Sequence, residues 1–224
     1  MKKRIIKATM LVLGLVLLIW LYQMNHYQLA SLWMISLSLG LGLAGFNHYQ
    51  HDVRELMIIV VMTSIAVVGR VSFFFVPSVS PMIPIVMITG IYFGRKEGYI
   101  VGMFAAFMSN FFFTQGPWTP FQMFTTSLIG YVSGIPLWKE TLKKSNIATI
   151  ILAVLSGILY SLLMDIWTVL SIDGYFNLKR YLIVLVPAIP YMVTYSMSNV
   201  IFMMVLKAPF GEKIKDLQNN YQLY

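Results

Sequence analysis

Polar residues crowd at one break between two apolar segments of the chain. The stretch reads Asn110-Phe-Phe-Phe-Thr-Gln-Gly-Pro-Trp-Thr-Pro-Phe-Gln-Met123. Gly116 and Pro117 end the first helix, because Pro lacks a backbone N–H and Gly permits backbone angles that other residues avoid. Thr119 followed by Pro120 predicts the N-cap and first position of the next helix. Hydrogen-bonding side chains then meet at one depth: Asn110, Thr114, Gln115, Trp118 and Gln122.

This polar corner, residues 110–123, admits two interpretations. In the first it is only a capped turn, with Trp118 among the aromatic residues that gather at a membrane surface. In the second it forms part of a small-molecule site, because a few convergent polar groups in apolar surroundings are typical of ligand pockets. We adopt the second as the prediction, with Asn110, Gln115, Trp118 and Gln122 as substrate-binding residues.

Two charged residues, Arg70 and Asp165, lie well inside apolar segments. A charge in hydrocarbon is costly even on lenient scales, so each needs a partner or a function. The two could pair with each other, Arg70 could extend to the lipid headgroups, or either could bind a polar ligand. Tyr175 and Tyr191 lie near the same predicted level, as interfacial aromatics or as ligand contacts. The predicted substrate site includes all four.

The sequence lacks the residue patterns of familiar catalytic and metal sites. No GxSxG, phosphate loop or acidic cluster is present, and no histidine neighbours a membrane serine. There are no cysteines, and His26, His48 and His51 do not have metal-binding spacing. We therefore predict neither an enzyme nor a resident metal or cofactor. Energy for any transport has to come from an ion gradient or from another protein.

The elements that position these residues are predicted to be membrane helices. Hydrophobic residues make up 58% of the 224 residues, charged residues 11%, and the mean hydropathy is +0.76. Such a composition indicates an all-α, polytopic membrane helix bundle. Eight apolar segments are predicted to be spans, at residues 8–22, 29–46, 55–75, 82–93, 99–113, 119–137, 147–170 and 181–206. Pro84 is expected to interrupt the fourth span, and residues 138–146 and 171–180 are expected to be loops.

The positions of the basic residues orient these spans. Thirteen Lys and Arg residues fall on one side when the loops are assigned alternately, namely Lys2, Lys3, Arg4, Lys7, Arg54, Arg95, Lys96, Lys139, Lys143, Lys144, Lys207, Lys213 and Lys215. Only Lys179 and Arg180 fall on the other side. The positive-inside rule therefore predicts cytoplasmic termini and an outward-facing polar corner. The net charge of +8 reflects this topology and the lipid surface, and it requires no nucleic-acid partner.

From Asp52 onward the chain resembles the substrate-binding subunit, or S component, of an energy-coupling factor vitamin transporter. Four stretches carry the resemblance: Asp52-Val-Arg-Glu-Leu-Met with Val67-Val-Gly-Arg-Val71; Pro84-Ile-Val-Met-Ile-Thr-Gly-Ile-Tyr-Phe-Gly-Arg95; Gln115-Gly-Pro-Trp-Thr-Pro-Phe-Gln-Met123; and Ser198-Asn-Val-Ile-Phe-Met-Met-Val-Leu-Lys-Ala-Pro209. The resemblance implies a six-helix substrate-binding core at residues 52–210. A pair of additional transmembrane helices, residues 1–51, would precede it, and a cytoplasmic tail, residues 211–224, would follow.

The resemblance also implies partners and a location. An S component lies in the bacterial plasma membrane, captures a vitamin from outside, and docks on a transmembrane coupling subunit that binds two cytoplasmic ATPases. Many members dock through an Ala-x-x-x-Ala motif on the first core helix. The corresponding stretch here, Thr63-Ser-Ile-Ala-Val-Val-Gly69, has small residues at another spacing. It points to Ser64, Ala66 and Gly69 as the docking residues.

The Gly-Pro-Trp-Thr-Pro sequence within the corner most resembles members associated with cobalamin, which is the predicted substrate. Riboflavin, pantothenate, folate or a queuosine precursor are alternatives. Two other classes of function also stay open: an autonomous ion-coupled carrier, and a membrane-embedded enzyme that uses Asp165 with Arg70 on lipid.

Overall fold

The computed structural model describes residues 53–221, together with residues 14, 16, 17, 20, 21, 24, 26, 29, 30, 32, 33, 35–37, 39 and 40. Seven helices follow one another from residue 53 onward: α3 (Val53–Ser72), α4 (Met82–Phe93), α5 (Arg95–Phe113), α6 (Thr119–Ser133), α7 (Pro136–Lys144), α8 (Asn146–Asp173) and α9 (Leu178–Tyr221). No strand occurs in these described ranges. Most of the predicted N-terminal pair of spans lies outside the described residues, as do the basic residues of the leader.

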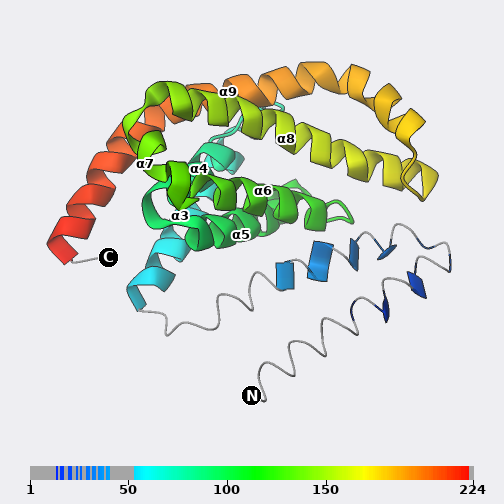
Figure 1. Cartoon of the computed structure of the whole chain (residues 1–224), viewed down its shortest axis with the longest axis horizontal. Coiled ribbons are helices and arrows are strands. Elements are labelled where there is room, and N and C mark those ends of the chain that lie inside the picture. Colours follow the sequence, from blue (N-terminus) through cyan, green and yellow to red (C-terminus); the bar gives the residue numbers. More distant parts are fainter. Residues whose placement is uncertain are drawn as a thin grey trace, which may run out of the picture.

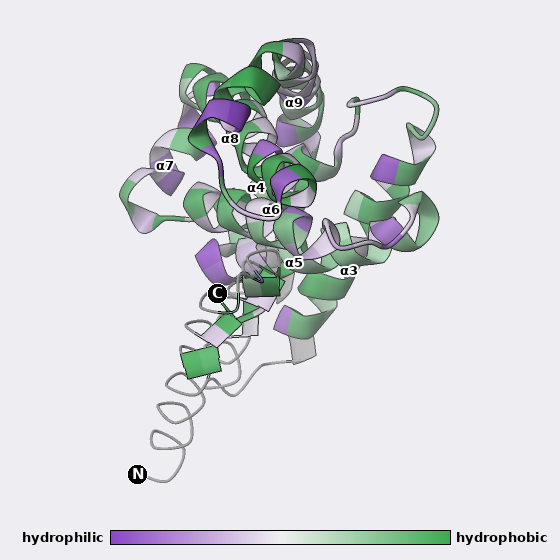
Figure 2. Ribbon diagram, turned by 90° about the vertical axis from the view of Figure 1, so that its right-hand side faces the viewer, coloured by the Kyte–Doolittle hydropathy of each residue, from purple (hydrophilic) through white to green (hydrophobic). Residues whose placement is uncertain are grey.

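Three helices are long and apolar enough to cross a membrane, at Glu55–Ser72, Asn146–Asp173 and Leu178–Ile214. Met82–Phe93 is a shorter apolar helix, and hydrophobic residues make up most of the helices in Figure 2. The described helices are therefore consistent with the predicted helical membrane protein. These helix lengths do not establish the predicted arrangement of six core helices and two N-terminal helices.

Helix α4 occupies the centre of the bundle. Eleven of its twelve residues are buried, and it packs against α3, α5, α6, α7 and α9. Helices α8 and α9 form a long pair that lies across the others in Figure 1. Pro84 falls in the first turn of α4, where the missing N–H would have no helical partner. It therefore does not interrupt this helix, contrary to the prediction.

Small residues bring α4, α5 and α6 into close contact. A side chain on Gly130 of α6 would collide with the backbone carbonyl of Gly98 in α5, and one on Gly90 of α4 would collide with the carbonyl of Gly130. Membrane helices commonly approach closely through such residues, because lipid supplies no hydrophobic drive to hold helices together. These contacts fix α5 beside α6, which places the two ends of the polar corner next to each other.

Two predicted loops are largely helical. Residues 138–144, predicted as part of a loop, belong to α7, which residues 136 and 137 begin at the predicted end of a span. Residues 171–173 and 178–180 extend α8 and α9 to leave a four-residue turn. Helix α9 also continues past the predicted span end, at residue 206, and through most of the predicted tail. Lys207 is buried there and donates to the carbonyl oxygen of Ser145, the Oδ1 of Asn146 and the Oγ1 of Thr149 at 2.9 to 3.2 Å. These bonds join α9 to the start of α8.

Candidate functional site

Asn110 connects three helices through a single buried side chain. Its Oδ1 accepts a hydrogen bond from Nη1 of Arg70 on α3 at 3.0 Å. Its Nδ2 donates to Thr119 Oγ1 at 3.1 Å and to Gln122 Oε1 at 2.6 Å, both on α6. The same Nη1 of Arg70 also donates to Ser109 Oγ on α5. Arg70 and the corner residues Asn110 and Gln122, which two separate arguments predicted as site residues, therefore meet in one network.

The polar corner closes on itself beside this network. Gln115 accepts from Thr119 Oγ1 at 3.0 Å and donates to the carbonyl oxygen of Phe107 at 2.8 Å. Trp118 is half-buried, and its ring lies against Gly116. The N-cap of α6 is Trp118, one residue before the predicted N-cap, Thr119. The hydroxyl of Thr119 instead accepts a hydrogen bond from the N–H of Gly116. Gln115 and Trp118 thus make contacts that shape the turn.

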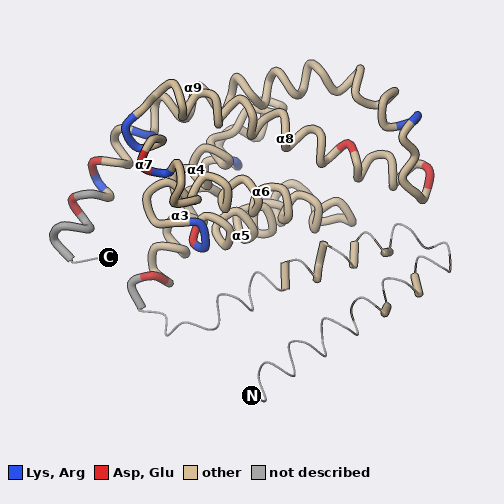
Figure 3. Tube along the Cα trace, viewed as in Figure 1, with Lys and Arg blue, Asp and Glu red and all other residues tan. Residues whose placement is uncertain are grey.

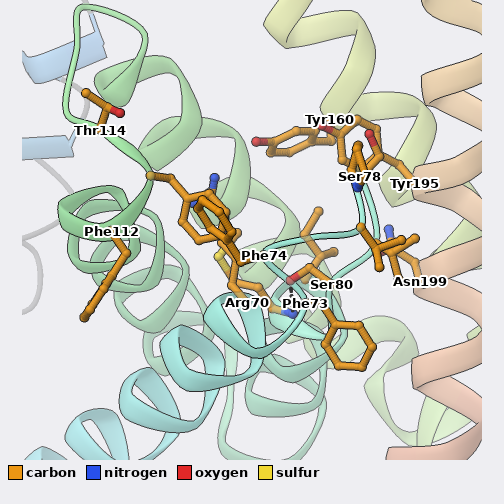
Figure 4. Close-up of a pocket in the computed structure, with 16 residues that line it drawn as sticks. Arg70, Phe73, Phe74, Ser78, Ser80, Phe112, Thr114, Tyr160, Tyr195 and Asn199 are labelled. Carbon is orange, nitrogen blue, oxygen red and sulfur yellow. Dashed lines mark hydrogen bonds between the residues drawn. The ribbon is translucent and has the colours of Figure 1, made fainter.

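A cavity of about 480 Å³ opens next to the Arg70 guanidinium. Figure 4 shows side chains converging on it from α3, α5, α8, α9 and the segment between α3 and α4. The corner contributes Phe112, Phe113 and Thr114 to its lining, while Asn110, Gln115, Trp118 and Gln122 lie outside the lining. The network therefore holds Arg70 from behind, and the cavity is bounded mainly by residues away from the corner.

Aromatic side chains make up much of the cavity wall. Tyr160 of α8 and Tyr195 of α9 pack with ring centroids 5.0 Å apart, and both line the cavity (Figure 4). On the opposite wall, Phe113 lies under the guanidinium of Arg70, with Cζ 4.4 Å from the ring centroid. The wall is thus largely aromatic, with polar groups from the two tyrosine hydroxyls, from Ser78, Ser80 and Thr114, from the amide of Asn199 and from Arg70.

The backbone is unusual where two segments enter the cavity. Ser78 and Thr114 are the two non-glycine residues with positive φ among those described, at 63° and 77°, and both line the cavity. A β-branched residue such as Thr rarely adopts this conformation. The segment that carries Ser78 is fixed to α9, since the N–H of Ser80 donates to Ser198 Oγ at 3.0 Å. Strained positions of this kind concentrate at ligand sites.

Three other predicted site residues do not reach the cavity. Asp165 makes no ion pair with Arg70, and its Oδ2 is buried without a hydrogen-bond partner among the described residues. The two charges lie at similar predicted depths, but α8 does not turn Asp165 toward α3. Tyr175 and Tyr191 are 47% and 57% exposed and line no part of the cavity. These positions correct the predicted grouping of Asp165, Tyr175 and Tyr191 with the polar corner.

Sequence reasoning missed the residues that α8 and α9 contribute. Tyr160, Tyr195 and Asn199 are absent from the predicted site, although all three line the cavity. Asn199 also joins α9 to α8, because it donates to Ser156 Oγ at 3.1 Å. A tyrosine in the middle of an apolar span was the available signal, because its hydroxyl needs a partner there.

The predicted docking residues fall into two groups. Ser64 and Gly69 line an apolar groove of about 450 Å³ between α3, α4 and α9. Ala66 is fully buried in the core, so it points away from this groove. A side chain on Gly69 would also press on Pro81, whose Cγ would be 2.7 Å away. Ser64 is exposed and is the accessible member of the set.

Charged residues gather away from the cavity. Figure 3 shows Lys and Arg near α7 and the neighbouring part of α9, and a second small group at the α8–α9 turn. There Arg180 pairs with Asp173 at 2.7 Å. Within the part of the chain that the structure describes, no three His, Asp or Glu side chains lie together in a way that could hold a metal ion.

Comparisons with known proteins bear on the same region of the chain. Neither the curated proteins nor the solved structures contain a match. Residues 50–212 match the model of DUF6580, which is described as a family of unknown function. This match includes every residue of the network and of the cavity wall. The chain therefore belongs to DUF6580.

Proposed function

We propose that this chain is the substrate-binding subunit of an energy-coupling factor uptake system for a vitamin-sized molecule. The observation that carries the proposal is the cavity beside Arg70. Its volume of about 480 Å³ lies within the range of small-molecule sites, about 300 to 1,000 Å³. A charged residue inside a membrane protein most often marks a substrate or ion pathway. Strained residues on two sides of the cavity give the proposal further support.

The orientation proposed from the lysine distribution suits capture from outside the cell. Thr114 and the segment at residues 73–80 would then face outward, and both line the cavity. The lysine-bearing helix α7 would face the cytoplasm, where the two ATPases would bind the coupling subunit. The proposed location of the whole assembly is the bacterial plasma membrane.

The apolar groove between α3, α4 and α9 is the proposed surface for the coupling subunit. Ser64 and Val68 of α3 form one wall, and Phe202 and Leu206 of α9 form another. A transmembrane helix of a partner can pack into such a groove, because membrane helices associate through close van der Waals contact. Ser64 is the small residue that would allow the closest approach.

Copurification with a coupling module tests this proposal. The chain is produced with a coupling subunit and two ATPases, and recovery of the complex on a tag carried by the coupling subunit is measured. Ser64→Trp should reduce recovery several-fold by filling the groove. Ser72→Trp is the matched control, because Ser72 is also exposed on α3 and its hydroxyl also bonds the carbonyl four residues earlier.

Two results would contradict the proposal. The first is absence of the wild-type chain from the purified complex with every coupling module tried. The second is substrate uptake by cells that contain this chain and no coupling subunit or ATPases, which would favour an autonomous carrier.

A further inference from the structure

Arg70 carries a positive charge that no described residue balances. Its partners are the hydroxyl of Ser109, the amide oxygen of Asn110 and the ring of Phe113, all of them neutral. Asp165, the other charge predicted at this depth, forms no ion pair with it among the described residues. A charge inside an apolar span is costly unless it is paired, so a counter-charge at this position would be favourable.

The guanidinium still has donors to offer to such a counter-charge. An arginine side chain has five N–H donors, and the two hydrogen bonds to Ser109 and Asn110 both use Nη1. The Nε and Nη2 groups have no protein acceptor among the described residues, and Arg70 lines the cavity. A carboxylate or phosphate group matches this free edge, because it can accept two parallel hydrogen bonds from one guanidinium.

The rest of the cavity limits what the anionic group is attached to. Tyr160, Tyr195, Phe73 and Phe74 present aromatic surfaces to it, and aromatic rings pack well against other flat rings. A volume of about 480 Å³ is in the lower half of the range for drug-sized ligands. A corrinoid, with its macrocycle, amide arms and nucleotide, is much larger than that.

We infer that the substrate is a compact organic anion, with one flat ring system and a carboxylate or phosphate group that binds Arg70. This inference rests on the proposed function, and it replaces cobalamin as the predicted substrate. The ring lies between the tyrosine pair and the phenylalanines, and the anionic group faces Nε and Nη2 of Arg70. Asn110 is a positioning residue, because it holds the guanidinium and does not line the cavity.

Matched acids and amides test the charge requirement directly. The full chain is purified in detergent and titrated calorimetrically with benzoate and benzamide, quinoline-2-carboxylate and its amide, and indole-3-acetate and its amide. Phenyl phosphate covers the alternative anionic group, and cobalamin is included. At least one anion should bind at least tenfold more tightly than its neutral partner, because hydrogen bonds from a charged donor to a charged acceptor are roughly twice as strong as neutral ones.

Variants of two arginines assign the effect to the cavity. Arg70→Gln should abolish the preference for the acid, and Arg70→Lys should keep part of it. Arg95→Gln is the control, because Arg95 also lies over an aromatic ring, that of Tyr131 at 5.7 Å, but lines no part of this cavity. The elution profile and unfolding midpoint of each variant show whether it is folded. If Arg70→Gln does not fold, Arg70→Lys provides the test, through a reduced preference for the acid.

Several outcomes would overturn the inference. These are equal binding of acids and amides, an acid preference that survives in Arg70→Gln, tight cobalamin binding, or no binding of any anion in the panel. The unfolding midpoint of the wild-type chain can also be compared between nanodiscs of neutral lipid and nanodiscs to which anionic lipid has been added. A higher midpoint with anionic lipid alone would also overturn the inference, because it would assign Arg70 to a lipid headgroup. The proposed function is scored separately by copurification with the coupling module, so the substrate class can fail while the transport role stands.

Discussion

Asn110 shows how much one buried amide can determine in a membrane protein. It satisfies Arg70, Thr119 and Gln122 at once, and each of these comes from an element that has to be placed relative to the others. The corner predicted that Asn110 lies close to Gln122, because the two residues are near one another in the sequence and flank a helix break, whereas Arg70 lies 40 residues before Asn110 and reaches it through the packing of α3. Short-range geometry was enough to bring Asn110 and Gln122 together.

Removing this amide should destabilise the fold as well as the site. Asn110→Ala leaves Gln122 and Thr119 without a buried donor and deprives Arg70 of an acceptor, so we expect a loss of about 1 to 3 kcal/mol in unfolding free energy. Denaturant or thermal unfolding in detergent measures it. Gln115→Ala is the comparison, because Gln115 is exposed and water can replace its bonds. Equal losses in both variants would contradict a special role for Asn110.

The raised pKa of Glu97 predicts that the free energy of unfolding depends on pH. Burial, reinforced by the neighbouring Glu55 carboxyl, raises the pKa of Glu97 to about 7. The unfolded chain releases this proton near pH 4.5, so the folded state holds more protons between pH 4.5 and 7 and stability falls as pH rises through that window. The Glu97→Gln substitution should therefore raise the free energy of unfolding by up to about 3 kcal/mol at pH 8 and by little at pH 4.5.

Unfolding midpoints of the two proteins across this pH range measure the effect. Glu140→Gln provides the control, since the exposed Glu140 has a pKa lowered by its hydrogen bond to Lys143. That substitution should give no gain that grows with pH. A gain in Glu97→Gln that is the same at every pH would assign the effect to packing instead of titration.

At the scale of elements, local sequence predicted the helices better than their ends. Lysines at positions 139, 143 and 144 suggested a loop, but Pro136 in the first turn and the buried Leu142 stabilise a short helix, α7. Lys207 suggested the end of the last span. It is tolerated inside α9 because three oxygen atoms of the neighbouring α8 start accept its hydrogens, and such partners are invisible without the tertiary structure.

The contact between α5 and α6 depends on the absence of a side chain. Gly130→Ala should cost about 1 to 3 kcal/mol, because its new methyl group would collide with the Gly98 carbonyl, a backbone atom that cannot move aside easily. Gly40→Ala is the matched substitution at an open position, where a Cβ would meet nothing within 4 Å. Thermal unfolding in detergent distinguishes them, and similar midpoints would show that α5 and α6 separate without strain.

At the scale of the whole molecule, composition was enough to predict a helical membrane protein, while the cavity required knowledge of helix rotation. Depth along a span follows from counting residues, so Arg70 and Asp165 were predicted at one level. Which face of α8 turns toward the cavity depends on packing along its whole length, and this rotation brings Tyr160, not Asp165, to the cavity. The rotation of α9 likewise depends on packing, so the sequence did not predict that Tyr195 and Asn199 line the cavity.

The predicted orientation can be tested cleanly because the chain has no cysteine. Thr114→Cys should react with a membrane-impermeant maleimide in intact cells, since the corner is predicted to face outward. Lys139→Cys should react only after the cells are opened. Both positions are in contact with solvent or only partly buried. The reversed pattern would invert the topology and place the cavity toward the cytoplasm.

The burial of α4 has a consequence for how the protein is made. At 12 residues, α4 is about 18 Å long, well short of the roughly 30 Å hydrocarbon core, and other helices cover nearly its whole surface. On leaving the ribosome it would have neither the length to span the bilayer alone nor neighbours in place to shield its ends. We therefore expect the membrane insertion machinery to retain α3 and α4 until α5 and α6 have been synthesised, and to release the four helices into lipid as one unit.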